Sequence, residues 1–219
     1  MGTRPSRRRR CGRAATFVIV TALVVSAACG SPEYHYVKSS SERTYVRVPR
    51  DWALFDEEKI TEGLDQSREA KEAYKRLAWS VAFDAAPSPS LEHVLSPKAD
   101  HPTGLVEVRT LSAAERDGFS LATLRSLLLE FDPLGDGGAP GVEVLGSRDV
   151  DRPGGLHGNE FVVNLKTTEG TRLKWRQIAL VDSAVRKVHV LAVSCEDDCY
   201  AANEKVIDQV ISSWQVKER

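Results

Sequence analysis

Four apolar runs in the second half of the chain restrict its fold more than any other feature. The runs are Val142 to Leu145, Glu160 to Lys166, Leu173 to Val181 and Val188 to Val193. They are rich in β-branched and apolar residues, which is typical of strands. Turn residues, Glu169-Gly170 and Asp182-Ser183, lie between the later runs. Because connections this short join antiparallel neighbours, the sequence predicts an antiparallel sheet.

The chain upstream predicts further strands and helices of one α+β domain, which we place at residues 44–219. The expected strands are Thr44 to Val48, Trp79 to Phe83 and Leu105 to Thr110. Helical spacing predicts one or two helices between Asp56 and Ala78, a helix from the N-cap Ser120 with Leu121, Leu124, Leu128 and Phe131 on one face, and a closing helix from about Ala201 that buries Ala202, Val206, Val210 and Trp214. Residues 85–103 are expected to form a loop with four prolines.

The N-terminal segment has the anatomy of a lipoprotein signal peptide. Arg7 to Arg10 and Arg13 precede the apolar run Ala14 to Val25, and Ser26-Ala27-Ala28 stand directly before Cys29. A charged region, a short apolar region and small residues before a cysteine predict cleavage before that cysteine and a lipid anchor, palmitate included, on its thiol. The export route, general or twin-arginine, stays open.

We therefore predict a signal peptide at residues 1–28 and a lipidated flexible tether at 29–43, where the chain is polar and rich in serine. Two alternatives are an uncleaved membrane anchor and secretion with a free Cys29. The apolar run from Ala14 to Ala28 is 15 residues long. This is shorter than the roughly 20 residues that span a bilayer, so we favour cleavage and an extracytoplasmic, membrane-anchored domain.

Removal of the signal peptide makes the protein acidic. Six of the 30 basic residues lie in the signal, which holds no acidic residue, so the mature chain carries 24 basic and 31 acidic residues and a formal net charge of −7. An acidic domain is repelled by nucleic acid and by anionic lipid headgroups unless a local basic face compensates. We expect no nucleic-acid partner.

The cysteines are consistent with export. Cys11 leaves with the signal and Cys29 takes the lipid, so Cys195 and Cys199 remain as a pair. In an oxidising compartment such a pair predicts a disulfide, which acts as a local staple because the loop is short. A thioredoxin-like pair needs two intervening residues rather than three, and a zinc site needs more ligands.

Several loose motifs resemble the PsbP-like domain family, which includes the LpqN-type actinobacterial lipoproteins. They are the segment Val46 to Trp52, the strand at Gly158-Asn159-Glu160, Arg176-Gln177 in the next strand, and Ile211 to Trp214 at the end of the closing helix. The resemblance implies an antiparallel sheet sandwiched by helices, an α/β/α arrangement, in proteins that serve largely in binding or assembly. The helical stretch from Asp56 to Ala78 and the cysteine pair depart from this pattern.

Motifs for catalysis, metals and cofactors are weak. The segment Asp132 to Gly138 lacks the ligand series of a calcium loop, and Gly154, Gly155 and Gly158 lack the residues that follow a phosphate loop, so they predict a surface loop and a turn. No G-x-S-x-G elbow occurs. The five histidines are His35, His93, His101, His157 and His189. None of them is paired at metal-binding spacing, so we expect neither a metal nor a cofactor.

One surface feature suggests a binding role. Lys166, Arg172, Lys174 and Arg176 alternate along a predicted hairpin, and we name them the basic strip. The strip is a candidate site for an anionic ligand or an acidic envelope protein. A plain solvated sheet face is the alternative.

We therefore predict a lipid-anchored, extracytoplasmic binding or assembly module without catalytic activity, whose partner is an envelope protein or a small ligand. The alternative is a small cell-envelope enzyme, most plausibly a hydrolase. An apolar pocket with a histidine beside a carboxylate would favour the enzyme.

Overall fold

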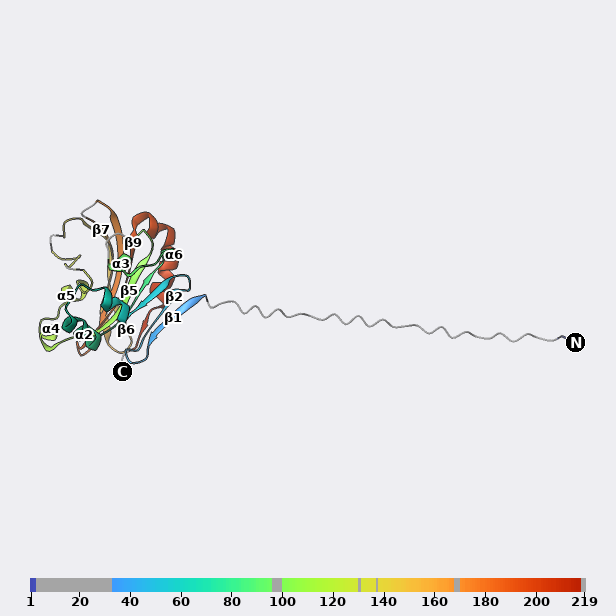
Figure 1. Ribbon diagram of the computed structural model, residues 1–219, viewed down its shortest axis with the longest axis horizontal. Helices are drawn as coiled ribbons and strands as arrows, with labels where there is room; N and C mark the ends of the chain where they lie inside the picture. The colour runs from blue at the N-terminus through green and yellow to red at the C-terminus, as the bar shows by residue number, and fades with distance from the viewer. Residues whose placement is uncertain (3–32, 96–99, 130, 137, 168–169, 218–219) are drawn as a thin grey trace. The chain divides into compact units, whose positions relative to one another are not determined.

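Two antiparallel sheets form the framework of the protein (Figure 1). The computed structural model describes residues 1–2, 33–95, 100–129, 131–136, 138–167 and 170–217. The described residues from 33 to 217 belong to one compact unit. The predicted signal peptide at residues 1–28 falls almost wholly outside the described residues, and Cys29 lies outside them as well. No helix in the described part of the chain is long and apolar enough to cross a bilayer.

The large sheet contains seven strands, and each strand pairs antiparallel with its neighbours. They are β3 (Ala53–Asp56), β4 (Ala78–Asp84), β5 (Thr103–Thr110), β6 (Val142–Arg152), β7 (Leu156–Lys166), β8 (Arg172–Val181) and β9 (Lys187–Glu196). Their order across the sheet is β3-β4-β5-β9-β8-β7-β6. The four runs of the second half therefore form the meander that the sequence predicts, with every strand longer than expected.

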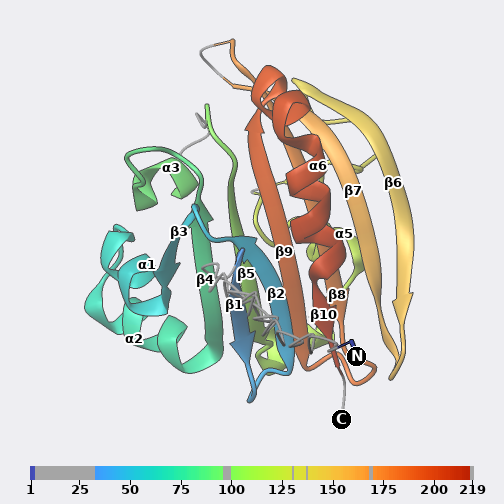
Figure 2. The same ribbon diagram turned by 90° about the vertical axis from the view of Figure 1, so that its right-hand side faces the viewer.

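The small sheet has three strands in the order β1-β2-β10. They are β1 (Tyr34–Ser39), β2 (Thr44–Pro49) and β10 (Gln215–Val216). Its inner face contributes Val37, Val46 and Val48 to the main core. Figure 2 shows β1 and β2 beside α6, in front of the large sheet.

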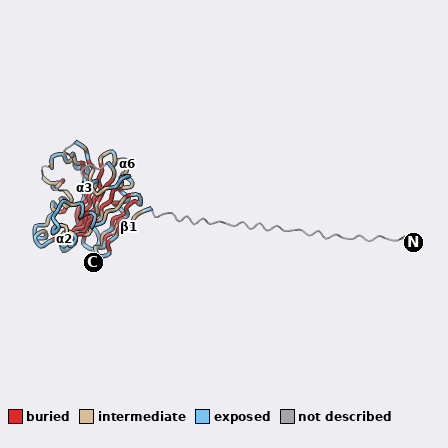
Figure 3. Tube along the Cα trace, in the orientation of Figure 1, coloured by how far each residue is buried: buried red, intermediate tan, exposed pale blue. Residues whose placement is uncertain are grey.

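Helices cover both faces of the large sheet, as the α/β/α expectation requires. They are α1 (Glu57–Gly63), α2 (Arg68–Leu77), α3 (Leu91–Leu95), α4 (Ala113–Asp117), α5 (Leu121–Arg125) and α6 (Asp197–Ser213). We call the side that carries Phe83, Val106 and Leu191 the α6 face, because these residues pack with α6 and the small sheet. The opposite side carries Ala82, Leu105 and Ala192 and is called the cavity face. Figure 3 shows the buried residues gathered along the strands. The predicted α+β class is confirmed.

The structure corrects the predicted tether at residues 29–43. Tyr34–Ser39 forms β1, which pairs with β2 from Tyr34 opposite Pro49 to Ser39 opposite Thr44. Ser41 and Arg43 lie in the turn between these strands. The polarity of the segment is misleading because β1 is an edge strand whose alternate side chains face solvent, while Val37 alone supplies its buried apolar anchor.

Two helix predictions also need correction. The helix after Ser120 ends at Arg125, so Leu128 and Phe131 lie in the following loop. The closing helix begins earlier than predicted, at Asp197. Its buried residues include Ile207 and Val210, whereas Ala202 is exposed, because helical geometry places Ala202 on a different side of α6 from the buried Tyr200 and Ile207. Residues 85–103 also contain the unpredicted α3.

The predicted disulfide is confirmed. Cys195 near the end of β9 is joined to Cys199 in the first turn of α6, with a Cα–Cα distance of 5.9 Å. The bond therefore connects the large sheet to the helix that covers it. The predicted turn at Gly154 and Gly155 joins β6 to β7, with φ angles of 90° and 85° that favour glycine.

Candidate functional site

An apolar cavity of about 340 Å³ lies on the cavity face of the large sheet. Strands β4, β5, β8 and β9 provide much of its floor, while α1, α3 and the loop after α5 cover it. The wall residues are mostly aliphatic: Ile60, Leu91, Val94, Leu95, Leu105, Leu128, Leu129, Leu165, Leu173 and Trp175. Its size falls within the range of small-molecule sites, about 300–1,000 Å³.

Small side chains in adjacent strands create the space. Ala82 in β4 lies opposite Leu105 in β5, and Leu105 lies opposite Ala192 in β9. Both alanines are buried, so the strands pack closely while little side-chain volume rises from the floor. Larger residues at these two positions would fill the cavity.

A polar row bounds this floor at one end. Asp84, Thr103 and Ser194 are paired across β4, β5 and β9, two residues along each strand from the small floor residues. Asp84 is fully buried, and its carboxylate accepts hydrogen bonds from the backbone N–H groups of Ala86, at 2.9 Å, and Ser90, at 2.8 Å. Asp84 thus holds the segment that leads into α3.

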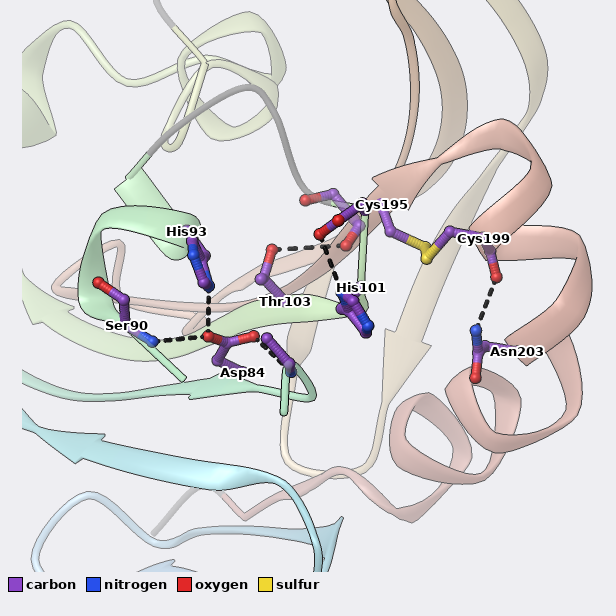
Figure 4. Close-up of polar contacts among 11 residues, drawn as sticks. Asp84, Ser90, His93, His101, Thr103, Cys195, Cys199 and Asn203 are labelled. Atoms are coloured by element: carbon purple, nitrogen blue, oxygen red, sulfur yellow. Dashed lines mark hydrogen bonds and ion pairs between the residues drawn. A yellow bond between two sulfur atoms is a disulfide. The ribbon is translucent and has the colours of Figure 1, made fainter. Parts of the chain in front are cut away.

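The same carboxylate contacts a histidine of α3, the helix that covers the cavity. Nδ1 of His93 lies 2.8 Å from Oδ2 of Asp84, and the His93 side chain is 39% exposed. Figure 4 shows His93 and Ser90 meeting at Asp84, with Thr103 nearby. A neutral ring that donates through Nδ1 carries its lone pair on Nε2.

A second polar cluster lies beyond the floor at its other end. The hydroxyl of Tyr74 in α2 donates to Oε2 of Glu107 at 2.5 Å and contacts Oγ of Ser80 at 3.0 Å. Arg109 lies 3.9 Å from the Glu107 carboxylate. Burial raises the pKa of Glu107 above its ordinary value and also raises the pKa of Tyr74, whose ionised form would face that carboxylate.

Replacement of Glu107 with glutamine is expected to change how stability depends on pH. Because the pKa of Glu107 is raised in the folded state, the folded protein holds this proton more tightly than the unfolded chain does. The stability that this proton contributes to the folded protein is therefore fully present below about pH 4.5. It is lost as pH rises through the pKa that Glu107 has in the folded protein. As pH rises through this range, the free energy of unfolding of Glu107→Gln, measured with urea, should rise relative to that of the unmodified protein.

Glu115 provides the matched control with the opposite sign. A hydrogen bond from Arg109 lowers the pKa of Glu115 from 4.5 to about 2. Its contribution to stability is present above 4.5 and is lost as pH falls toward 2, so Glu115→Gln should lose relative stability as pH rises through that range. If the unfolding free energies of the two variants changed with pH in the same direction relative to the unmodified protein, the raised pKa of Glu107 would be contradicted.

Polar contacts hold the loop that covers the cavity. Gln177 is fully buried, accepts from Nε1 of Trp175 at 3.3 Å and donates to the carbonyl oxygen of Arg125 at 3.2 Å. Arg125 also forms two hydrogen bonds with Asp132, at 2.7 and 2.5 Å. This pair connects the end of α5 to the loop beyond Leu128 and Leu129, so the two leucines are held over the sheet.

The basic strip lies on the opposite side of the sheet, next to α6. Arg172 pairs with Glu143 at 2.6 Å, and Lys174 pairs with Asp197 at 3.0 Å. Arg176 contacts both Glu160 and Asp208, at 2.7 and 2.5 Å. Lys166 lies opposite Arg172 in the hairpin. Acidic side chains from β6, β7 and α6 therefore compensate much of the charge that the sequence pattern indicates.

The cavity residues were not singled out by the sequence analysis, and the basic strip is not part of this site. A signal for the adjacent polar clusters exists, because Asp84 ends a largely apolar strand and Glu107 interrupts another. The partner of Glu107, Tyr74, lies 33 residues away along the chain, and the contact of Asp84 with His93 crosses a turn, so spacing alone assigns neither. Within the described ranges, no three side chains of His, Cys, Asp or Glu lie close enough together to hold a metal ion.

Comparisons with known proteins give structural similarity only. No protein-family model and no curated protein sequence matches the chain. The solved structures that are similar to it include the following three. The cyanobacterial PsbP of Synechocystis sp. PCC 6803 is 13% identical, with a TM-score of 0.45 and coverage of 89% of this chain and 99% of that chain.

The other two belong to a bacterium and a yeast. LpqN of Mycobacterium tuberculosis, described as involved in cell envelope biogenesis, is 15% identical, with a TM-score of 0.45. The match covers 84% of this chain and 91% of LpqN. The Ran-binding protein Mog1p of Saccharomyces cerevisiae is 10% identical, with a TM-score of 0.43. The match covers 84% of this chain and 95% of Mog1p. PsbP and LpqN are the two kinds of protein to which the sequence resemblance points.

Proposed function

We propose that the protein is a non-catalytic binding module, anchored through a lipid on Cys29 to the extracytoplasmic face of the cell membrane, and that it holds an apolar ligand segment in the cavity. The observation that carries the binding role is the cavity itself, about 340 Å³ with largely aliphatic walls. The signal-peptide pattern supports the anchor and the location.

The walls of the cavity define the chemistry of the ligand. Leucine, valine and isoleucine side chains offer dispersion contacts and release water when an apolar group enters. The Asp84 row lies at one end of the floor and the Glu107 cluster at the other. A ligand with an apolar body and one polar end therefore fits this site better than a uniformly polar ligand.

A hydrolase is the second candidate, and one observation favours it. The contact between Asp84 and Nδ1 of His93 has the form of the carboxylate–histidine half of a nucleophilic triad. Asp84 also accepts two backbone N–H groups, however, and these bonds give its burial a structural cause. We therefore rank binding first.

Filling the floor of the cavity is expected to abolish tight binding. In Ala192→Leu the larger side chain rises from the floor into the space between β5 and the covering leucines. A fatty acid with a dansyl group serves as the probe, and its fluorescence is titrated with protein. We expect the variant to bind about tenfold more weakly or worse, because added methylenes in an occupied site cost about 1–3 kcal/mol.

The matched control places the same substitution on the surface. Ala202 is exposed on α6, so Ala202→Leu should bind the probe as the unmodified protein does. Absence of saturable binding by the unmodified protein, or equal affinity in Ala192→Leu, would contradict the proposal. Turnover of a p-nitrophenyl acyl ester that disappears in His93→Ala would instead support the hydrolase.

A further inference from the structure

The outer face of the small sheet combines tyrosines and cations. The residues that point away from the core share one side of β1, β2 and β10, and we name them the outer face: Tyr34, Tyr36, Lys38, Tyr45, Arg47 and Gln215. None of these six residues is acidic. The mature chain as a whole carries a net charge of −7, so this face differs in charge from the rest of the molecule.

The tyrosines and Arg47 are already arranged as a layer. The rings of Tyr36 and Tyr45 stack, with their centroids 6.3 Å apart and an interplanar angle of 24°. The guanidinium carbon of Arg47 lies 5.3 Å from the ring centroid of Tyr34. Tyr36 is nevertheless 58% exposed. Because the side chains support one another across the strands, little conformational entropy remains to be lost on contact with a surface.

The start of β1 also lies close, along the chain, to the predicted lipid anchor. Only residues 30–33 separate Cys29 from Tyr34, because the segment predicted as a tether forms a strand instead. At about 3.3–3.6 Å per residue, the five steps from Cys29 to Tyr34 span at most about 18 Å. An anchor on Cys29 therefore keeps the start of β1 near the bilayer.

We propose that the outer face docks on an anionic lipid surface, with its tyrosines at the level of the headgroups and Lys38 and Arg47 against the lipid phosphates. Tyrosine is enriched at membrane interfaces because its ring is apolar and its hydroxyl is polar. Lysine and arginine are attracted to anionic headgroups. The docked domain would present the cavity face of the large sheet away from the bilayer, because the small sheet packs on the α6 face.

The inference rests on the proposed function in one respect, because the lipid anchor places the outer face near the bilayer. The test uses a protein without that anchor and so does not depend on it. A chain that begins at Gly30 retains every strand and helix of the structure. It is sedimented with phosphatidylglycerol-containing vesicles and, in parallel, with vesicles of phosphatidylcholine alone. We expect binding to the anionic vesicles, and weaker binding to the neutral ones.

Two substitutions on the outer face separate the contributions of charge and aromatic surface. Arg47→Ser should weaken binding to anionic vesicles about fivefold at low salt, and this difference should shrink at high salt. Tyr36→Ser should weaken binding at both salt concentrations, because its contribution is not ionic. Arg116→Ser, an exposed cation on α4, is the matched control and should bind normally. Unchanged melting temperatures confirm that all three variants fold.

Other results would overturn the inference. These are absence of binding to anionic vesicles, or equal binding by Arg47→Ser, Tyr36→Ser and the unmodified chain. Retention on an insoluble glycan without vesicle binding would assign the tyrosine layer to a saccharide instead. Ala192→Leu, which fills the cavity, should bind vesicles normally, and lipidation is measured separately as the mass of the protein extracted from membranes. The three measurements therefore distinguish failure of the proposed ligand binding in the cavity, of the proposed lipid anchor and of the proposed membrane docking by the outer face.

Discussion

Replacement of Gly158 with alanine is expected to destabilise the protein by about 3 kcal/mol or more. Gly158 lies within β7, between Val150 of β6 and Leu180 of β8. A Cβ atom at this position would stand 2.0 Å from the carbonyl oxygen of Ala179 and 2.9 Å from the Cα of Leu180. Both neighbours are backbone atoms of a paired strand, so relief requires the ladder between β7 and β8 to open.

Gly146 in β6 offers the matched control. A Cβ atom added there meets nothing within 4 Å, so Gly146→Ala should change the free energy of unfolding little. Urea unfolding of both variants, followed by circular dichroism, measures the difference. Equal stability of the two variants would show that β7 and β8 can separate locally at Gly158 without cost to the fold.

Replacement of Arg176 with methionine is expected to cost about 3–5 kcal/mol, the usual loss when one partner of a buried ion pair is removed. The Arg176 side chain is 21% exposed, and its partner Glu160 is only 6% exposed. Arg148 also contacts Glu160, but its own side chain is 66% exposed. Without Arg176, the Glu160 carboxylate stays buried with much of its charge uncompensated. Urea unfolding at neutral pH measures the loss.

The neighbouring Arg172→Met should cost about 1 kcal/mol or less, because it breaks a surface pair. Arg172 and Glu143 are 53% and 60% exposed. Similar losses in the two variants would contradict the distinction between a buried and a surface pair. The contrast also decides how the basic strip is tested. A change at Arg176 is expected to destabilise the fold, whereas a change at Arg172 is expected to leave the fold intact and can therefore report on a partner.

Local patterns predicted the strands of the second half because each strand carries its own signal. The residues from Leu173 to Val181 and from Val188 to Val193 are apolar over most of their length, and the turn between them contains Asp182 and Ser183. No information from elsewhere in the chain is needed to infer an antiparallel pair. The disulfide was predictable for the same reason, because Cys195 and Cys199 are neighbours in sequence.

The tether was predicted wrongly because the signal of β1 is not local. Tyr34–Ser39 has a single fully buried apolar residue, Val37, and its strand conformation depends on pairing with β2. The helix after Ser120 failed in the opposite way. Leu128 continues the helical spacing, but the loop after Arg125 is held by Gln177 of β8, 52 residues away, and by Asp132 within the loop itself.

The amino-acid sequence by itself determined the class of the fold, the antiparallel meander and the disulfide, because alternation, turn residues and short spacings act over a few residues. The tertiary structure alone decided which side chains meet. The cavity needs Ala82, Leu105 and Ala192 in three strands from distant parts of the chain. The pairing of Arg176 with Asp208 likewise depends on where α6 packs. Such contacts follow from strand order and helix packing, which no local pattern records.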